Sequence, residues 1–310
     1  MNKEILNYEL PTFGNLGAGN PTASGSLANF VLNRRMIALR SVIHALCRIN
    51  PRLATELLLF LFLRPRRKPI TYTRKLPAGA RPITIYHNLC KLKGYEWGDG
   101  SKTILLVHGW ESHLGHMLPV VKPLLDAGFK VMAFDAPGHG QSPQLYSNMV
   151  DFGDAVRDAV EQYAPIHAII GNSFGGAATA LSLKRNKSIS VDRLILVSPM
   201  QHILQHIDIF DCLMDVPDEV MSRVLWKIAG RIGMPLGQCD VLEAVSDLSM
   251  PGLLIHDVED EVIPVQSSRM IADVWQNSFY VETTGLGHRG AIRDKCVIDE
   301  IIHFLKSVPA

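Results

Sequence analysis

Apolar residues follow a helical pattern in the first part of the chain. From Ser26 to about Leu63 they recur at spacings of three and four residues, the period of an amphipathic helix. Asn50-Pro51 interrupts this pattern, because the residue before a proline disfavours the helical backbone. Residues 1 to about 26 show no period and are rich in Gly, Asn, Pro, Ser and Thr. We therefore predict a tail or extended arm and then two helices, an N-terminal extension over residues 1–68.

From about Pro69 the pattern changes to short apolar runs that alternate with helical stretches. Alternating residues at 83–86 and the run at 90–97 predict a hairpin that closes near His87-Asn88. The later runs are apolar throughout, as in strands buried on both faces of a sheet. They lie at 103–107, 130–134, 168–170, 193–197, 252–255 and 279–281, and the helical stretches lie at about 114–127, 148–163, 174–186, 265–276 and 291–307. Repeated strand–helix units predict an α/β domain over residues 69–310 with a mostly parallel sheet.

The segment from Ser198 to Met250 is too long for a single crossover between neighbouring strands. It contains amphipathic pieces at His202–Phe210, Glu219–Ile232 and Val241–Leu248. We therefore predict a helical cap, inserted at about residues 200–248 over the strand ends.

Composition narrows the class of protein. Of the 310 residues 47% are hydrophobic, enough for a buried core, which excludes wholesale disorder. Thirty-one Lys and Arg balance thirty Asp and Glu, so the chain offers no general field for nucleic acid, and we expect no nucleic-acid partner. The five cysteines are scattered, which is typical of reduced thiols rather than of a disulfide framework or a zinc site.

The second predicted helix ends in LLLFLFL (57–63) and is followed by the basic run Arg64–Lys68. We favour packing of the helical pair on the main body, with the basic run in solvent, because apolar helix faces are more often buried in protein. The alternative is a peripheral membrane contact through residues 53–68. The apolar run is too short to span a bilayer, and the N-terminus lacks the pattern of a secretory signal. We therefore expect a cytoplasmic protein.

A serine stands at a sharp strand-to-helix turn in Gly171-Asn172-Ser173-Phe174-Gly175. The pentapeptide follows an apolar strand and precedes a helical stretch. Glycine at the flanking positions lets the chain turn sharply and lets the helix approach the strand, with the serine in a strained conformation. Such a turn lifts the hydroxyl above the sheet, at the positive end of the following helix. Ser173 is therefore the candidate nucleophile.

Other strand ends supply the groups that a nucleophilic serine needs. The loop after Val107-His108-Gly109 can direct the backbone N–H of Trp110 at the oxygen of a tetrahedral intermediate, and the N–H of Phe174 would be the second donor. The turn-rich segment at 134–142 borders this site.

An acid and a base follow later short strands, in His256–Asp260 and in Gly285–Arg289. The chain order is then Ser, Asp, His, with His288 as the base. Asp257 comes directly off its strand, and we expect it to turn the loop through side-chain-to-backbone hydrogen bonds. Asp260 lies further along, at the apex of the loop, and is the better candidate for the acid.

The stretch from about Tyr86 to Leu305 resembles the α/β-hydrolase superfamily, and in particular its serine esterases and lipases. The segments LLVHGW, AFDAPGHGQS, IIGNSFGG, LLIHDVEDEVIP and GLGHRG match its motif blocks in order. The resemblance implies an α/β-hydrolase fold, with an eight-stranded, mostly parallel sheet flanked by helices. It also implies a triad of Ser173 as nucleophile, Asp260 as acid and His288 as base, with the Trp110 and Phe174 amides as oxyanion donors. It extends neither to the cap nor to residues 1–68.

This chemistry requires no metal or organic cofactor. His108 and His139 are expected to brace loops by hydrogen bonds. His108, His113 and His116 lack the carboxylate-rich pattern of a metal cluster. His202 and His206 are four residues apart but lack the Glu of an H-E-x-x-H frame, and we expect them on an exposed face of a cap helix.

The leading hypothesis is hydrolysis of a carboxylic ester, as in an esterase or small lipase, with a small acyl compound as substrate. An acyltransferase or thioesterase would use the same acyl-enzyme and differ only in the acceptor or the leaving group. A non-catalytic binding protein on the same fold is the alternative from another class. The sequence does not determine the acyl-chain length or the oligomeric state.

Overall fold

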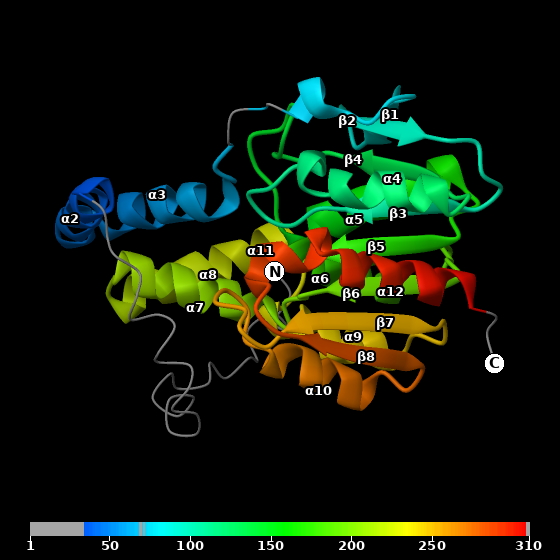
Figure 1. Ribbon diagram of the computed structural model, residues 1–310. Helices are drawn as coiled ribbons and strands as arrows, with labels where there is room; N and C mark the ends of the chain where they lie inside the picture. Colours follow the sequence, from blue (N-terminus) through cyan, green and yellow to red (C-terminus); the bar gives the residue numbers. More distant parts are fainter. Residues whose placement is uncertain (1–33, 68–69, 71, 308–310) are drawn as a thin grey trace. The chain divides into compact units, whose positions relative to one another are not determined.

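The computed structural model describes residues 34–67, 70 and 72–307 (Figure 1). They form two compact units. The helical unit contains the described residues up to Leu63 together with Ile203–Cys239. The sheet unit contains Arg64–His202 and the described residues from Asp240 onward. The expected arm over residues 1–26, and the start of the first expected helix, lie outside the described residues.

The sheet unit contains an eight-stranded sheet in the order β1-β2-β4-β3-β5-β6-β7-β8. The strands are β1 (Arg81–His87), β2 (Cys90–Trp97), β3 (Thr103–Val107), β4 (Lys130–Phe134), β5 (Ala168–Asn172), β6 (Arg193–Val197), β7 (Gly252–Asp257) and β8 (Ser278–Thr283). The pairs β1–β2 and β2–β4 are antiparallel, and every pair from β4 to β8 is parallel. The predicted α/β fold class with a mostly parallel sheet is confirmed.

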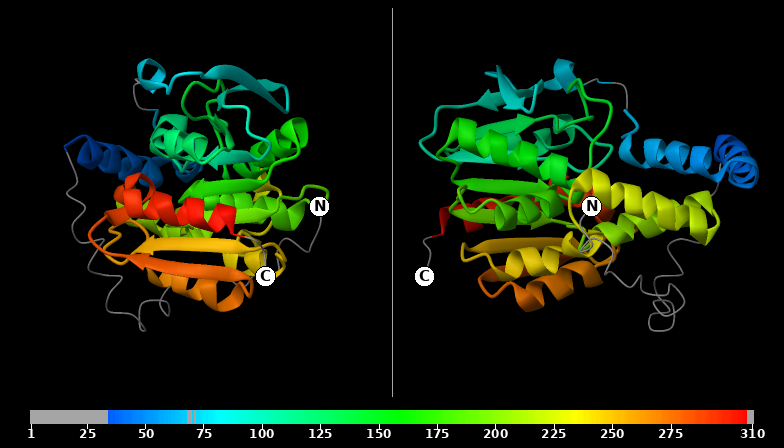
Figure 2. Two further views of the ribbon diagram at one scale, coloured as in Figure 1. Left: turned by 45° about the vertical axis from the view of Figure 1, so that its right-hand side comes forward. Right: turned by 180° about the vertical axis from the view of Figure 1, so that it is seen from behind.

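Helices cover both faces of this sheet (Figures 1 and 2). They are α4 (Leu118–Asp126), α5 (Met149–Tyr163), α6 (Phe174–Arg185), α9 (Val241–Ser246), α10 (Gln266–Val274), α11 (Gly287–Gly290) and α12 (Lys295–Lys306), with short 3-10 turns at Tyr72–Lys75, Leu114–His116 and Ala291–Arg293. On one face α12 contacts α4, and on the other α6 contacts both α5 and α9. The expected helix at 114–127 begins four residues late, because a 3-10 turn precedes it.

The central strands explain the apolar runs in the sequence. All five residues of β3 and of β6 are buried, because helices cover these strands on both sides. Trp97, Leu124, Ile301 and Phe304 join the same core cluster. Each such side chain stabilises the fold by roughly 1.5–3 kcal/mol relative to exposure. This core fixes the strand ends, where the candidate site lies.

The helical unit contains α2 (Arg34–Ile49), α3 (Pro51–Leu63), α7 (Ile203–Met214), α8 (Asp218–Ile232) and a 3-10 turn at Leu236–Gln238. Helix α3 contacts α2 and α8. The ring of Phe62 lies 5.3 Å from that of Phe210 and 5.4 Å from that of His206, and Glu56 forms a 2.7 Å ion pair with Lys227. The break at Asn50-Pro51 therefore separates two helices as expected, and their partners in the unit come from the predicted cap.

The structure divides the chain differently from the predicted boundaries at residue 68 and at residues 200–248. The unit that begins before residue 68 also includes Ile203–Cys239. The last predicted cap helix, α9, belongs to the sheet unit, where it contacts α6 and α10. The basic run is not simply solvated either. Arg66 binds both carboxylate oxygens of Glu111, and Arg67 donates hydrogen bonds to the carbonyl oxygens of Gly138 and Ser142.

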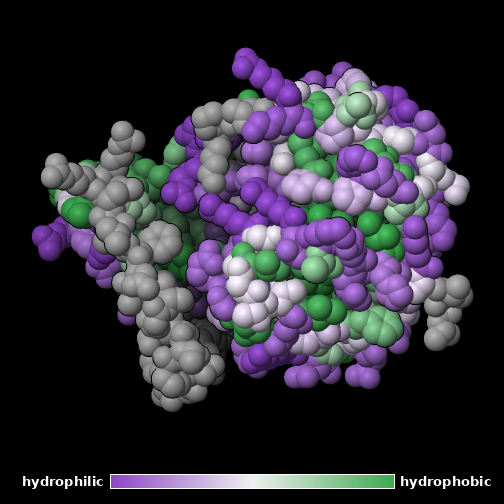
Figure 3. All heavy atoms as spheres, viewed as in Figure 1, coloured by the Kyte–Doolittle hydropathy of each residue, from purple (hydrophilic) through white to green (hydrophobic). Residues whose placement is uncertain are grey.

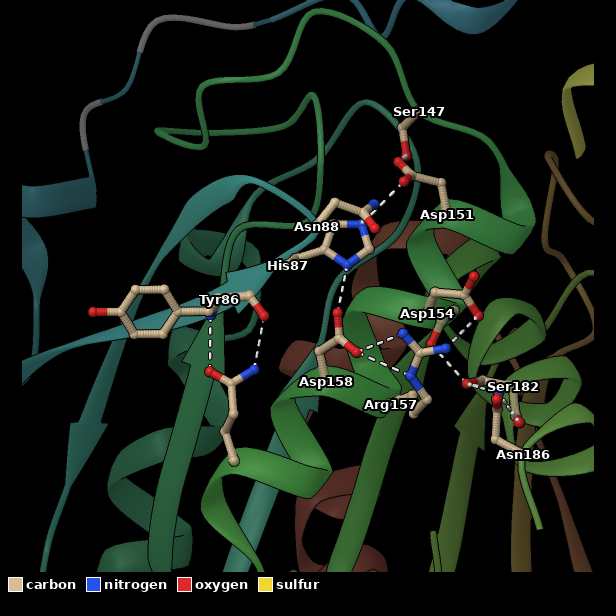
Figure 4. A network of polar contacts seen from close by, with 12 residues as sticks. Tyr86, His87, Asn88, Ser147, Asp151, Asp154, Arg157, Asp158, Ser182 and Asn186 are labelled. Atoms are coloured by element: carbon tan, nitrogen blue, oxygen red, sulfur yellow. Dashed lines mark hydrogen bonds and ion pairs between the residues drawn. The ribbon is translucent and has the colours of Figure 1, made fainter. Parts of the chain in front are cut away.

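A buried histidine connects the β1–β2 hairpin to α5 (Figure 4). The side chain of His87 is 1% exposed, and its Nδ1 and Nε2 lie 2.7 and 3.0 Å from carboxylate oxygens of Asp158 and Asp151. Burial alone would lower the pKa of His87, but the hydrogen bonds to Asp151 and Asp158 outweigh it and raise the pKa. Arg157 extends the network, because it also binds Asp158. The two carboxylates therefore favour the protonated, cationic form of the His87 ring.

Candidate active site

The strand-to-helix turn predicted around Ser173 joins β5 to α6. The backbone of Ser173 has φ 54° and ψ −127°, a strained combination for a residue with a Cβ. A Cβ on Gly175 would lie 2.1 Å from the carbonyl oxygen of His108, and one on Gly171 would lie 2.6 Å from the Cα of Gly176. Both flanking glycines are therefore required by close backbone approach, as the sequence indicated.

The three residues predicted as a triad lie in one chain of hydrogen bonds, although they are far apart in the sequence. The Nε2 atom of His288 is 3.1 Å from Oγ of Ser173, and its Nδ1 is 2.7 Å from Oδ2 of Asp260. His288 lies in α11, the short helix that follows β8, and Asp260 lies on the loop that follows β7. Parallel neighbouring strands end at the same edge of the sheet, which brings both loops to the elbow.

The carboxylate of Asp260 is fully buried and its four neighbours are all donors. Oδ1 accepts hydrogen bonds from the amides of Val262 and Ile263, both at 2.8 Å. Oδ2 faces His288 at 2.7 Å and the Nε2 of His256 at 3.3 Å. Burial alone would raise the pKa of Asp260, but the hydrogen bonds from His256 and His288 outweigh it and lower the pKa. Asp260 is therefore ionised at neutral pH and can orient the imidazole.

The chain is similar in sequence and in fold to known proteins. A sequence model of the family described as serine aminopeptidase, S33, matches residues 98–234. A bifunctional esterase/perhydrolase of Acinetobacter calcoaceticus is 24% identical over 241 residues, which cover 62% of this chain and 87% of that protein. The solved structure of the Pyrococcus furiosus esterase Pf2001 has a TM-score of 0.61 at 20% identity, and the match covers 79% of this chain and 98% of that one. The chain has the α/β-hydrolase fold, and these matches support its membership of the α/β-hydrolase superfamily.

A third relative matches over a shorter stretch. A pimeloyl acyl-carrier-protein methyl ester esterase of Neisseria meningitidis is 31% identical over 133 residues, which cover 43% of this chain and 47% of that enzyme. Together these relatives support hydrolase activity in general terms for this α/β-hydrolase.

The predicted oxyanion residues flank the elbow of this α/β-hydrolase. Phe174 is the first residue of α6, and its ring lies 5.0 Å from that of Trp110. A Cβ on Gly109 would lie 3.2 Å from the Cβ of Ser173 and 3.6 Å from its Oγ. The loop after β3 therefore runs directly beside the serine side chain, so the segment that carries the Trp110 amide borders the reacting position.

Two buried histidines hold the neighbouring loops. The Nδ1–H of His108 donates to the carbonyl oxygen of Gly109 at 2.7 Å, and its Nε2 accepts from the amide of Ala136 at 3.0 Å. The Nδ1–H of His139 donates to the carbonyl oxygen of Pro137 at 2.8 Å. Burial lowers the pKa of each histidine to about 3, so both rings are neutral. They brace loops, in line with the sequence analysis.

A buried carboxylate organises the loop after β4. Asp135 accepts hydrogen bonds from the hydroxyl of Tyr72 and from the amides of Leu114 and Gln141. Burial raises the pKa of Asp135 and outweighs the effect of these hydrogen-bond donors.

Among the described residues no group of three His, Cys, Asp or Glu side chains is placed to hold a metal ion.

Sequence reasoning missed two neighbours of the site. His256 lies in the segment LLIHDVEDEVIP, but the sequence analysis did not predict its contact with Asp260, four residues further on. Its fully buried ring also bonds Oγ of Ser268 at 2.6 Å and the carbonyl oxygen of Ile263 at 2.9 Å. Asp257 was expected to turn its own loop, and it does accept from the amide of Glu259 at 3.1 Å. Its further partners across the β7–β8 pair depend on strand register, which no local motif reveals.

Proposed function

We propose that this protein is a serine hydrolase that cleaves carboxylic esters through an acyl-enzyme on Ser173. The proposal rests on one observation above all: the hydrogen-bonded chain from Ser173 through His288 to the buried Asp260, at a strained elbow. A serine hydroxyl is a poor nucleophile at its own pKa, and an adjacent imidazole is the usual means of activating it.

In the first half of the reaction, Nε2 of His288 accepts the proton of Ser173 as Oγ attacks the acyl carbon. The carbonyl electron pair moves to the oxygen, and the amides of Trp110 and Phe174 stabilise this oxyanion. As the tetrahedral intermediate collapses, the ester C–O bond breaks and the imidazolium gives its proton to the departing alcohol. Asp260 stabilises the imidazolium and holds the imidazole tautomer in which Nε2 is the acceptor.

In the second half, His288 accepts a proton from water while the water oxygen attacks the acyl carbon. The second intermediate collapses, the bond to Oγ breaks, and the proton returns to Ser173 as the carboxylic acid leaves. Two relatives, an esterase/perhydrolase and a methyl ester esterase, support the choice of an ester as substrate.

The test is a panel of p-nitrophenyl esters of increasing acyl length, assayed with and without thioester and lactone competitors. We expect turnover that depends on acyl length, and covalent labelling by a fluorophosphonate probe that is absent in Ser173→Ala. Stronger turnover of a thioester, or acyl transfer to an added alcohol or amine, would favour the thioesterase or acyltransferase alternative. A folded protein that neither turns over esters nor reacts with the probe would favour the non-catalytic binding protein.

A further inference from the structure

The side chain of Asp257 is fully buried at the end of β7, and its carboxylate is surrounded by donors. Oδ1 accepts from the amides of Glu259 and Gly287 at 3.1 and 3.0 Å. Oδ2 accepts from the hydroxyl of Thr283 at 2.9 Å and from the amide of Leu286 at 3.1 Å. Three of these four donors therefore belong to β8 and to the turn after it.

Those donors lie next to the proposed catalytic base. Leu286 and Gly287 directly precede His288, and the turn has left-handed backbone at Gly285 (φ 82°) and Gly287 (φ 60°). Asp257 also begins the loop of the proposed acid, since its carbonyl oxygen accepts the amide of Asp260 at 3.1 Å. One residue thus contacts both of the loops that meet at the imidazole.

The donors around Asp257 favour the ionised form of its carboxylate. Burial alone would raise the pKa of Asp257, but the hydrogen bonds from Gly287, Thr283 and Leu286 outweigh it and lower the pKa. Hydrogen bonds to an ionised acceptor are shorter and stronger than those between neutral groups. An amide in the same place would offer one oxygen, and its NH₂ group would face two of the four donors.

We propose that Asp257 is a positioning residue that holds the backbone of His288 in the geometry needed for proton transfer from Ser173. The inference rests on the proposed function of His288. It explains why a charged side chain lies at the end of β7, three residues before the acid itself. The physical reason for an effect on rate is that a misplacement of about 1 Å in a reacting group can lower turnover roughly a hundredfold.

The decisive variant is Asp257→Asn, compared with two controls. Glu259→Gln makes the same carboxyl-to-amide change on an exposed residue of the same loop. Thr283→Val removes one donor to Asp257 but leaves the backbone amides of Leu286 and Gly287 bound to it. We expect Asp257→Asn to lower kcat for the best ester by about 10- to 100-fold with little change in KM. We expect both controls to keep kcat within about twofold.

A second measurement does not depend on turnover. In ¹⁵N-histidine-labelled protein the Nδ1–H of His288, bonded to Asp260, should give a low-field proton signal that is absent in His288→Gln. We expect this signal to shift or broaden in Asp257→Asn and to persist in Glu259→Gln and Thr283→Val. A merely structural role would lower the melting temperature without moving the signal.

The outcomes separate the two proposals. If the parent neither hydrolyses esters nor reacts with the fluorophosphonate probe, the proposed function is wrong, while the signal still tests Asp257. A folded Asp257→Asn variant with parental kcat and an unchanged signal overturns the positioning role. If Asp257→Asn does not fold, Asp257→Ser, whose smaller hydroxyl can accept fewer bonds, replaces it. Failure of both to fold assigns Asp257 to stability alone and also overturns the inference.

Discussion

Two regions of the molecule differ in the kind of side chain that they bury. The strand ends of the sheet unit bury carboxylates, whereas the apex of the α2–α3 hairpin, residues 48–53, exposes apolar side chains. Asp257 and Asp260 are buried, and each carboxylate meets four donors. At the hairpin apex, Ile49 is 82% and Leu53 is 52% exposed, in a run of exposed residues. Fully satisfied buried polar groups give one rigid geometry, whereas exposed apolar groups give an adaptable surface. The rigid strand ends therefore suit catalysis, and the adaptable hairpin apex suits contact with another surface.

The largest effect that we expect is at the strand ends. Ser173→Ala should remain folded and lose about a millionfold in kcat, because members of a triad act as a unit. Ester turnover and the melting temperature of the purified variant check this. Parental turnover in a folded Ser173→Ala protein would refute Ser173 as the nucleophile.

Asp257 and Asp260, three residues apart at the strand ends, should differ in how strongly their loss lowers kcat. Asp260→Asn should lower kcat by about ten thousandfold, because an amide no longer holds the imidazole tautomer that accepts the serine proton. This loss exceeds the 10- to 100-fold loss that we expect for Asp257→Asn, since Asp257 acts only through the backbone of His288. Parallel assays of the two variants test the order. A larger loss at Asp257, with Asp260→Asn near normal, would reverse the assignment of the acid.

Gly175 in the sheet unit and Gly230 in the helical unit differ in how closely other atoms pack around them. A Cβ on Gly175 would lie 2.1 Å from a backbone oxygen, whereas one on Gly230 in α8 would have nothing within 4 Å. Gly175→Ala should therefore lower the free energy of unfolding by about 3 kcal/mol or more through overpacking. Gly230→Ala should leave it unchanged or raise it by up to about 1 kcal/mol, because alanine favours the helix. Urea denaturation measures both, and equal effects would contradict the close approach at the elbow.

The buried His87 predicts a pH dependence in the sheet unit. Because its pKa is raised in the folded protein, its stabilisation is fully present below the unfolded value of about 6.5 and is lost as the pH rises through the folded value. His87→Gln should therefore lower the free energy of unfolding by about 2 kcal/mol near pH 6, with a smaller difference from the parent at pH 9. Denaturation at both pH values tests this, and a constant difference would show that the ring is neutral.

Much of the strand-end geometry was predictable because it depends on local sequence. Each motif block lies where a buried strand ends, and parallel strands end at one edge, so Ser173, Asp260 and His288 could be expected to meet. The fold class was predictable for the same reason, and the structure confirms it. The contacts of Asp257 with Leu286 and Gly287 were not predictable, since they depend on the β7–β8 register.

The helical unit was less predictable, because a helical period shows an apolar face without showing what covers it. The period correctly indicated α2 and α3, but packing on the main body and contact with lipid both fitted the run at 57–63. In the structure Leu58, Leu59, Phe62 and Leu63 are buried, and α3 contacts α2 and α8. The apolar run that suggested a membrane contact is therefore largely unavailable for one, and the exposed apolar side chains lie elsewhere.

Those exposed side chains occur on α2 and at the hairpin apex. Ile37 and Val42 are 52% and 54% exposed, and the apex adds Ile49 and Leu53. Figure 3 shows hydrophobic side chains beside hydrophilic ones at the surface of this hairpin. Between residues 34 and 63 the sequence has five arginines and a single acidic residue, Glu56, which is paired with Lys227. No helix among the described residues is both long and apolar enough to cross a bilayer.

We propose that the apex, rather than the run at 57–63, makes a peripheral contact with anionic lipid. Arg48 and Arg52 are exposed beside Ile49 and Leu53, so positive charge and apolar side chains are presented together. Near an anionic membrane each such arginine contributes about 1 kcal/mol of attraction. This combination of positive charge and apolar side chains suits a lipid surface with anionic headgroups.

The smallest expected effect is accordingly a difference in vesicle binding. The full chain should co-sediment with vesicles of phosphatidylcholine and phosphatidylglycerol about tenfold more tightly than with phosphatidylcholine alone. Arg48→Gln/Arg52→Gln should remove this preference, and Ile49→Ser/Leu53→Ser should weaken binding to both. Leu89→Ser, at an exposed leucine of the β1–β2 turn in the sheet unit, is the matched control and should bind as the parent does. Equal binding to both kinds of vesicle, or an equal loss of binding in Leu89→Ser, would contradict the proposed contact. Self-association of the parent without vesicles would instead assign the apex to contact with a second copy of the chain.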